Sequence, residues 1–313
     1  MRKITLSLLI SLYSLSFLRA DPSILQHYEA VFSQLPNWNV DIAELQPFGN
    51  GCTNQNYLLN LGCDRYFVRI GSHSKEILGL TFAKEIELIL MAATLGISPP
   101  ILVADALHGI IIFPFIESKP VNLRNKEKLA NAIELLKKFH ACDKTLSFTA
   151  TPENIFDLYL KQLEKLDIKL SEHQKLLIAK RPIPTLMTLV PCHLDLKGEN
   201  LLDDGNRLWL IDWEYGGMSD PLFDLATLAP AAGFSENELN TALELYAPRP
   251  TEELKQRLKQ FRILANLRIA LWCLIMSRMS TLDHPYQQWA DELFDEVDFQ
   301  ISELCSHCRK KAG

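Results

Sequence analysis

Residues 193–200 read His-Leu-Asp-Leu-Lys-Gly-Glu-Asn, and residues 211–215 read Ile-Asp-Trp-Glu-Tyr. We expect Asp195 and Asn200 on a loop that enters a strand, and Asp212 at the end of the paired strand, so that the three side chains converge on one metal–phosphate centre. Asp195 can orient or deprotonate a hydroxyl group, whereas Asn200 and Asp212 offer the oxygen ligands that Mg²⁺ prefers. The pattern predicts phosphoryl transfer, because a polar loop without a function would not carry all the residues that this chemistry needs at the required spacing.

The first run resembles the H-x-D-x-x-x-x-N catalytic loop of the protein-kinase-like superfamily. The residues that follow do not fit a protein kinase, because Asp212 precedes Trp-Glu rather than Phe-Gly, and Asp220 arrives too soon for an activation segment. Residues 211–226, IDWEYGGMSDPLFDLA, are instead similar to the choline/ethanolamine kinase branch of the aminoglycoside phosphotransferase-like family, in its bacterial LicA-type form. This similarity covers most of the chain from about residue 44.

The resemblance implies an enzyme that transfers the γ-phosphoryl group of ATP, with Mg²⁺, to the hydroxyl of a small amino alcohol, most simply choline or ethanolamine. Asp195 would be the catalytic base, and Asn200 and Asp212 would be the metal ligands. The implied fold is α+β and protein-kinase-like, with two lobes. We expect a nucleotide-binding lobe at residues 21–116 and a mainly helical catalytic and acceptor-binding lobe at 117–313.

Hydrophobic periodicity supports this division. The predicted first lobe contains a hairpin unit at 44–70, a helix at 81–95 that Gly96 ends, and strands at 101–103 and 109–115. The predicted second lobe is helical except for a short strand pair. Its strands lie at 200–203 and 207–211, and its helices at 129–140, 155–170, 236–246, 252–279 and 287–304.

The composition of the chain excludes several classes of protein. Its 313 residues are 48% hydrophobic and 22% charged, which excludes disorder and low-complexity scaffolding. The net charge of -6 provides no positive field for phosphate backbones, so we expect no nucleic-acid partner. The seven cysteines lack a regular spacing, which argues for a reducing compartment.

The amino-terminal residues have features of an export signal. Met1-Arg2-Lys3 and the apolar run 4–18 resemble the start of a secretory signal, but the run is too short to span a bilayer comfortably, and Leu18-Arg19-Ala20 is a poor cleavage site. Residues 1–20 are therefore a signal-like or lead-in segment. We expect a cytoplasmic protein without a stable membrane span, because the chemistry needs a cytosolic nucleotide, while export stays open.

The resemblance also assigns residues to nucleotide binding. Gly51, Thr53 and Asn54 are similar to the turn that covers the phosphates, and Arg69 falls where these kinases carry a cation for them. Such a cation is usually held by a Glu on the next helix. We assign that role to Glu87, since Glu85 lies about 200° away around the helix and only one of them can face inward.

Phe113 and Phe115 belong to the segment that would form the hinge, whose backbone reads adenine while apolar side chains enclose the ring. This assignment follows from the family position alone. His193 is expected to brace the catalytic loop by hydrogen bonds, and Asp224 to serve as a helix N-cap or a buried brace rather than as a reactant.

A quaternary ammonium acceptor calls for aromatic faces and one or two carboxylates. Glu214 and Tyr215 directly follow the metal-binding segment, and Trp272 lies in a helix similar to the acceptor-binding segment of the family. A Trp in an apolar helix is also typical of simple core packing. The family commonly has a Gln in this helix near the position of Met276, which leaves the acceptor open.

Two alternatives remain from the sequence. An aminoglycoside or thiamine kinase of the same fold is one, and the acidic residues between 291 and 298 could serve several ammonium groups, although they fit a solvated helix face better. A catalytically silent nucleotide-binding protein is the other, against which the complete set Asp195, Asn200 and Asp212 argues. The oligomeric state stays open.

Overall fold

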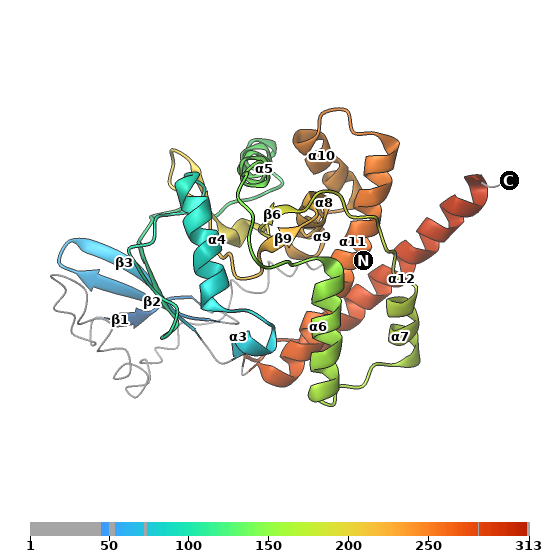
Figure 1. Cartoon of the computed structure of the whole chain (residues 1–313), viewed down its shortest axis with the longest axis horizontal. Coiled ribbons are helices and arrows are strands. Elements are labelled where there is room, and N and C mark those ends of the chain that lie inside the picture. Colours follow the sequence, from blue (N-terminus) through green and yellow to red (C-terminus); the bar gives the residue numbers. More distant parts are fainter. Residues whose placement is uncertain (1–44, 50–53, 72–73, 281, 312–313) are drawn as a thin grey trace. The chain divides into compact units, whose positions relative to one another are not determined.

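Two compact units make up the chain (Figure 1). The computed structural model describes residues 45–49, 54–71, 74–280 and 282–311, so the predicted segment 1–20 and the predicted phosphate-turn residues Gly51 and Thr53 lie outside it. The amino-terminal unit contains the described residues up to Pro120 together with Leu202–Glu214. The carboxy-terminal unit contains Val121–Leu201 and the residues from Tyr215 onward.

The amino-terminal unit is built on a five-stranded antiparallel sheet in the order β1-β2-β3-β5-β4. Its strands are β1 (Leu45–Pro47), β2 (Asn54–Leu61), β3 (Asp64–Gly71), β4 (Val103–Asp105) and β5 (Ile110–Pro114). β2 and β3 form the predicted hairpin, whose turn contains Gly62 at φ +61°. β5 lies between β3 and β4, and its residues Ile110, Ile111 and Ile112 are fully buried, so both faces of this strand are covered.

Two helices follow the hairpin, α3 (Ser74–Ile77) and α4 (Phe82–Thr94). α4 starts at Thr81, whose side chain accepts a hydrogen bond from the backbone N–H of Lys84, and Gly96 follows its end at φ +65°. The start of α4 packs tightly on the end of β3, because a Cβ atom at Gly71 would lie 2.1 Å from the Phe82 ring.

A short hairpin, β7 (Leu201–Asp203) and β8 (Leu208–Leu210), joins this unit from far along the sequence. The N–H of Leu210 donates to the carbonyl of Ile97 at 2.9 Å, and the N–H of Lys119 donates to the carbonyl of Asp203 at 3.0 Å. These backbone bonds explain why residues 202–214 group with the amino-terminal unit, whereas the sequence analysis placed them in the second lobe.

The carboxy-terminal unit is mainly helical. Its helices are α5 (Lys126–His140), α6 (Pro152–Lys165), α7 (Glu172–Ala179), α8 (Pro221–Ala226), α9 (Leu228–Ala232), α10 (Glu236–Tyr246), α11 (Glu252–Met279) and α12 (Tyr286–Lys311). β6 (Val190–Cys192) pairs with β9 (Gly217–Ser219), and a 3-10 turn, η2, covers Gly198–Asn200. The α+β class, with a sheet-based first unit and a helical second unit, is confirmed.

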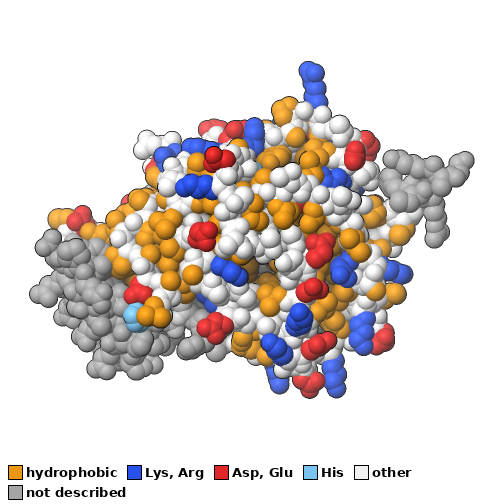
Figure 2. Space-filling view, in the orientation of Figure 1, with side chains coloured by type: hydrophobic (Ala, Val, Ile, Leu, Met, Phe, Trp, Pro, Cys, Tyr) orange, Lys and Arg blue, Asp and Glu red, His pale blue; other side chains and the backbone are white. Residues whose placement is uncertain are grey.

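α11 forms the centre of the carboxy-terminal unit. It packs against α6, α8, α9 and α12, and it is long and apolar enough to cross a membrane by length and composition. The most apolar window of this helix is 72% buried, as expected for the core helix of a globular unit. Charged side chains of both signs lie interspersed over the face shown in Figure 2.

Candidate active site

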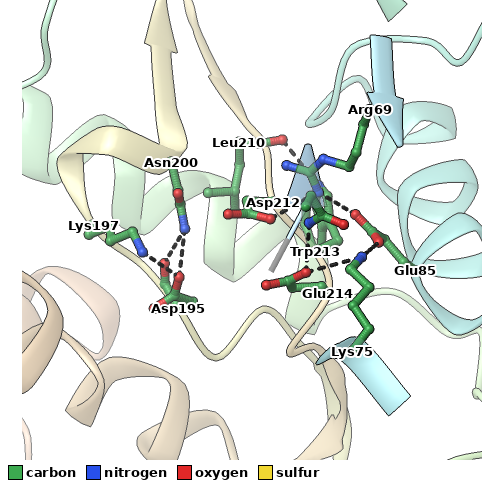
Figure 3. Close-up of polar contacts among 11 residues, drawn as sticks. Arg69, Lys75, Glu85, Asp195, Lys197, Asn200, Leu210, Asp212, Trp213 and Glu214 are labelled. Carbon is green, nitrogen blue, oxygen red and sulfur yellow. Dashed lines mark hydrogen bonds and ion pairs between the residues drawn. The ribbon is translucent and has the colours of Figure 1, made fainter. Parts of the chain in front are cut away.

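The loop with the predicted catalytic residues begins where β6 ends. Asp195 is 7% exposed, and the side-chain amide of Asn200 donates to its backbone carbonyl at 2.8 Å and to its Oδ2 atom at 2.9 Å (Figure 3). Lys197 Nζ lies 2.8 Å from the same carboxylate oxygen. Both bonds from Asn200 use its amide nitrogen, which leaves the amide oxygen as the atom for a metal. The structure therefore joins two of the predicted catalytic residues directly.

A buried carboxylate holds this loop in a strained conformation. Leu194, the residue before Asp195, has φ +63°, a left-handed value that costs about 1–3 kcal/mol for a residue other than glycine. The N–H groups of His193 and Leu194 each donate to one carboxylate oxygen of Asp224 at 2.7 Å. Asp224 is thus the buried brace, whereas Asp220 is the N-cap of α8.

The brace continues away from the loop. His140 Nε2 lies 3.0 Å from Asp224, and its Nδ1 atom lies 2.9 Å from the Tyr246 hydroxyl. Burial alone would raise the pKa of Asp224, but the hydrogen bond and charge of His140 and the contacts with His193 lower the pKa below its ordinary value. The N–H of Asp195 donates to His193 Nδ1 at 3.2 Å, so the predicted bracing role of His193 is confirmed.

We expect Asp224→Asn to lower the free energy of unfolding at neutral pH by about 3 kcal/mol, because one amide oxygen cannot replace two carboxylate oxygens that accept buried N–H groups. The lowered pKa means that the carboxylate stabilises the fold fully above an unfolded-state pKa of about 4 and loses this effect as pH falls through the folded-state pKa. Urea unfolding at several pH values measures both effects. The exposed Asp143→Asn is the control, and an equal loss in both variants would contradict the prediction.

A buried network of charges lies in the amino-terminal unit (Figure 3). Arg69 on β3 forms ion pairs with Glu85 of α4 and, at 2.9 Å, with Asp212. Lys75 of α3 lies 2.6 Å from Glu85 and 3.1 Å from Glu214. Asn54 donates to Glu214 at 2.9 Å, which ties the strand after the predicted phosphate turn into the network.

The network sets the ionisation of its members. Burial alone would lower the pKa of the Arg69 guanidinium, but the carboxylates of Asp212, Glu85 and Glu214 raise it above its ordinary value. Burial and the charge of Asp212 raise the pKa of Glu214, against the opposing effect of Lys75. Arg69 is therefore a fixed positive charge beside Asp212.

The assignment of Glu87 as the partner of Arg69 is wrong. Glu85 is 0% exposed and pairs with Arg69, whereas Glu87 is exposed. The phase of α4 is the reason, since Glu85 lies three and four positions before the buried Leu88 and Ile89 and shares their face. This apolar stripe was visible in the sequence and could have decided between the two.

Asp212 also has a left-handed backbone, with φ +68°. Its side chain is 24% exposed, and the adjacent Trp213 anchors the segment by donating from its buried indole to the Leu210 carbonyl at 3.1 Å. Strain of this kind persists only where the surroundings hold it, and it gathers at functional sites.

A cavity of about 230 Å³ lies in the same unit, and the predicted residues Arg69, Phe113, Phe115 and Asp212 all line it. Phe48, which the sequence analysis missed, adds a further aromatic wall and packs edge-to-face on Phe115 at 5.5 Å. The N–H of Phe115 donates to the Arg65 carbonyl, so this amide is already used within the sheet. The cavity has aromatic walls, and its charged lining residues are Arg69, Asp212 and Glu117.

The three predicted acceptor residues have different surroundings. Glu214 was predicted to contact the acceptor. In the structure it is buried and contacts Lys75 and Asn54. The Arg268 guanidinium lies 4.9 Å from the centre of the Tyr215 ring.

Trp272 packs on Tyr286 at 5.9 Å between ring centres, and Tyr286 packs on Trp289 at 5.5 Å. The indole N–H of Trp272 is buried without a hydrogen-bond partner among the described residues. We call Trp272, Tyr286, Trp289 and the adjoining His284 the aromatic cluster.

The fold and these residues define a small-molecule kinase with a protein-kinase-like architecture. Residues 44–261 match the model of the phosphotransferase enzyme family, APH, and the chain belongs to this family. It is 27% identical over 246 residues to Protein LicA of Haemophilus influenzae, an alignment that covers 72% of each chain.

Two solved structures share the fold. A choline/ethanolamine kinase family protein from Mesorhizobium loti has a TM-score of 0.69 at 24% identity, covering 91% of this chain and 97% of that one. The choline kinase LicA from Streptococcus pneumoniae also has a TM-score of 0.69, at 22% identity, with 88% and 98% covered.

Proposed function

We propose that the protein transfers the γ-phosphoryl group of ATP to the hydroxyl of a small amino alcohol, choline or ethanolamine. ATP binding is supported by the cavity whose lining combines aromatic side chains with Arg69 and Asp212. An adenine ring would lie between its apolar walls. Arg69 would bind the phosphates, since a guanidinium can donate to two phosphate oxygens at once.

The donor set fits Mg²⁺. The carboxylate of Asp212 and the amide oxygen of Asn200 are hard oxygen ligands, and Asp212 keeps part of its side chain exposed. These two residues would hold the ion. When bound, Mg²⁺ would neutralise charge on the phosphate oxygens.

Asp195 would accept the proton of the acceptor hydroxyl as its oxygen forms a bond to the γ-phosphorus, and the bond from that phosphorus to the β-phosphate oxygen would break to release ADP. Asn200 and Lys197, both bonded to the Asp195 carboxylate, orient it for this step. The tightly packed loop supplies the fixed geometry that such a transfer needs.

The aromatic cluster would bind the cationic end of the acceptor. Cation–π attraction to such rings stabilises a bound cation by about 0.5–2 kcal/mol. It also avoids the cost of removing both charges of an ion pair from water. The LicA alignment supports this choice of acceptor over thiamine, because it covers 246 residues of this chain, whereas the alignment with the thiamine kinases, also at 27% identity, covers 119. We also propose that the protein works in the cytoplasm, where ATP is available.

We expect Trp272→Ala to raise the KM for the amino alcohol by about 3- to 30-fold, the range that one cation–π contact provides. The KM for ATP should change little, because Trp272 belongs to the carboxy-terminal unit and the cavity belongs to the amino-terminal unit. Initial-rate kinetics with each substrate varied in turn measure both constants. Trp209→Ala, on β8, is the control, and an unchanged acceptor KM in Trp272→Ala would remove this residue from the acceptor site.

The experiment that tests the proposal is Mg²⁺-dependent ADP release by the purified full chain. Choline, ethanolamine, thiamine and an aminoglycoside are tested separately, with Asp195→Ala as the blank. Stimulation by choline or ethanolamine alone supports the proposal. Stimulation only by thiamine or the aminoglycoside replaces the acceptor, and no stimulation by any of the four, in a folded protein that binds ATP, rejects it.

A further inference from the structure

Arg268 is a buried cation without a carboxylate partner among the described residues. It lies on α11 and is 2% exposed. One of its nitrogens, Nη1, donates to the carbonyl of Leu194 at 2.5 Å, and its Nε atom has no hydrogen-bond partner within the part of the chain that the structure describes. Burying a guanidinium without a counter-ion is costly, so a position of this kind needs a reason.

The hydrogen bond to the Leu194 carbonyl gives a reason for the buried position of Arg268. Leu194 directly precedes Asp195 and has the left-handed φ of +63°. Its N–H is held by the Asp224 carboxylate at 2.7 Å and its carbonyl by Arg268. The strained peptide units are thus held from both sides, by a buried anion at the N–H and a buried cation at the carbonyl.

Arg268 also reaches toward the predicted acceptor residues. Its guanidinium lies over the Tyr215 ring at 4.9 Å, and Trp272 follows one helical turn later on α11. A single side chain of α11 therefore contacts both the residue before Asp195 and the ring of Tyr215.

We propose that Arg268 is a positioning residue, which fixes the Asp195 carboxylate for proton transfer through the Leu194 carbonyl. This inference rests on the proposed function for its kinetic meaning, because it assumes that Asp195 is the base. Without the guanidinium, the carbonyl of Leu194 loses its partner and the loop relaxes from its strained conformation. A shift of about 1 Å at the reacting group can cost about 100-fold in rate.

The test compares Arg268→Lys and Arg268→Met with wild type. Lys keeps the charge and a donor nitrogen but not the planar group that lies over the Tyr215 ring. We expect kcat to fall about 10-fold in Arg268→Lys and about 100-fold in Arg268→Met, with the KM values for ATP and acceptor within about 2-fold of wild type. A residue with only a structural role would lower the stability without this split between kcat and KM. Arg278→Met is the matched control, an exposed Arg on the same helix.

Amide hydrogen exchange of residues 193–196 in the protein without substrates is the second measurement. Exchange should become at least about 10-fold faster in both Arg268 variants, and it should not change in Arg278→Met. This readout needs no acceptor. If wild type phosphorylates none of the tested alcohols, the proposed function fails, while the exchange rates still decide whether Arg268 holds the loop.

Unchanged kcat in both Arg268 variants would overturn the proposal, as would unchanged exchange or an equal effect in Arg278→Met. If Arg268→Met does not fold, Arg268→Lys decides alone. Wild-type kcat and wild-type exchange in that variant would overturn the proposal, whereas a lower kcat with unchanged KM values and faster exchange would support it.

Discussion

Asp195→Asn is expected to lower kcat by about 10³-fold or more while the protein stays folded and binds ATP. The amide has nearly the same shape as the carboxylate, so it can keep the hydrogen bond from Asn200, but it cannot accept the proton of the attacking hydroxyl. ADP release at saturating ATP and acceptor measures kcat. Thermal unfolding and ATP titration show whether the fold and the nucleotide site are intact.

Glu199→Gln is the matched control for this variant. Glu199 lies in the same loop, one residue before Asn200, but its side chain is exposed. Its loss should leave kcat within about 2-fold of wild type, as for most surface substitutions. Substantial residual turnover in Asp195→Asn would remove Asp195 from the role of base.

Glu85→Gln is expected to destabilise the protein by about 3–5 kcal/mol and to raise the KM for ATP. Glu85 is fully buried and lies between two cations, Arg69 and Lys75, so a neutral amide removes one of the two carboxylates that each cation contacts. Arg69 would also lose a partner that holds it beside the proposed nucleotide cavity. Urea unfolding gives the loss of stability, and initial rates at varied ATP give the KM.

Glu87→Gln separates the two glutamates of α4. Its side chain is exposed, so we expect a change in the free energy of unfolding within about 0.5 kcal/mol and an unchanged KM for ATP. The reverse result, with a large loss in Glu87→Gln and none in Glu85→Gln, would contradict the network seen in the structure.

The sequence predicted that Asp195 and Asn200 lie close together, because both belong to a motif with a defined spacing, and the two residues are hydrogen-bonded in the structure. The hairpin of β2 and β3 was also predictable, since alternation and turn residues are local signals. The grouping of residues 202–214 with the amino-terminal unit was not, because it depends on backbone bonds between distant segments, such as Leu210 with Ile97.

Side-chain partners were harder to predict than backbone elements. The choice between Glu85 and Glu87 depended on the phase of α4, which the apolar residues of the helix carry. Lys75 and Arg268 have no motif of their own, and their roles arise only from what folding brings beside them. A single Lys or Arg in a sequence does not by itself indicate whether folding will bury it.

The buried charges of the amino-terminal unit also determine how the protein responds to salt. Dissolved salt ions screen solvent-exposed charges, with a Debye length of about 8 Å at 0.15 M ionic strength, but they screen buried ion pairs much less. The side chains of Arg69, Lys75 and Glu85 are each at most 8% exposed. Their mutual attraction should therefore persist over a wide range of ionic strength, so that Arg69 keeps its orientation beside the aromatic cavity when the salt concentration around the protein changes.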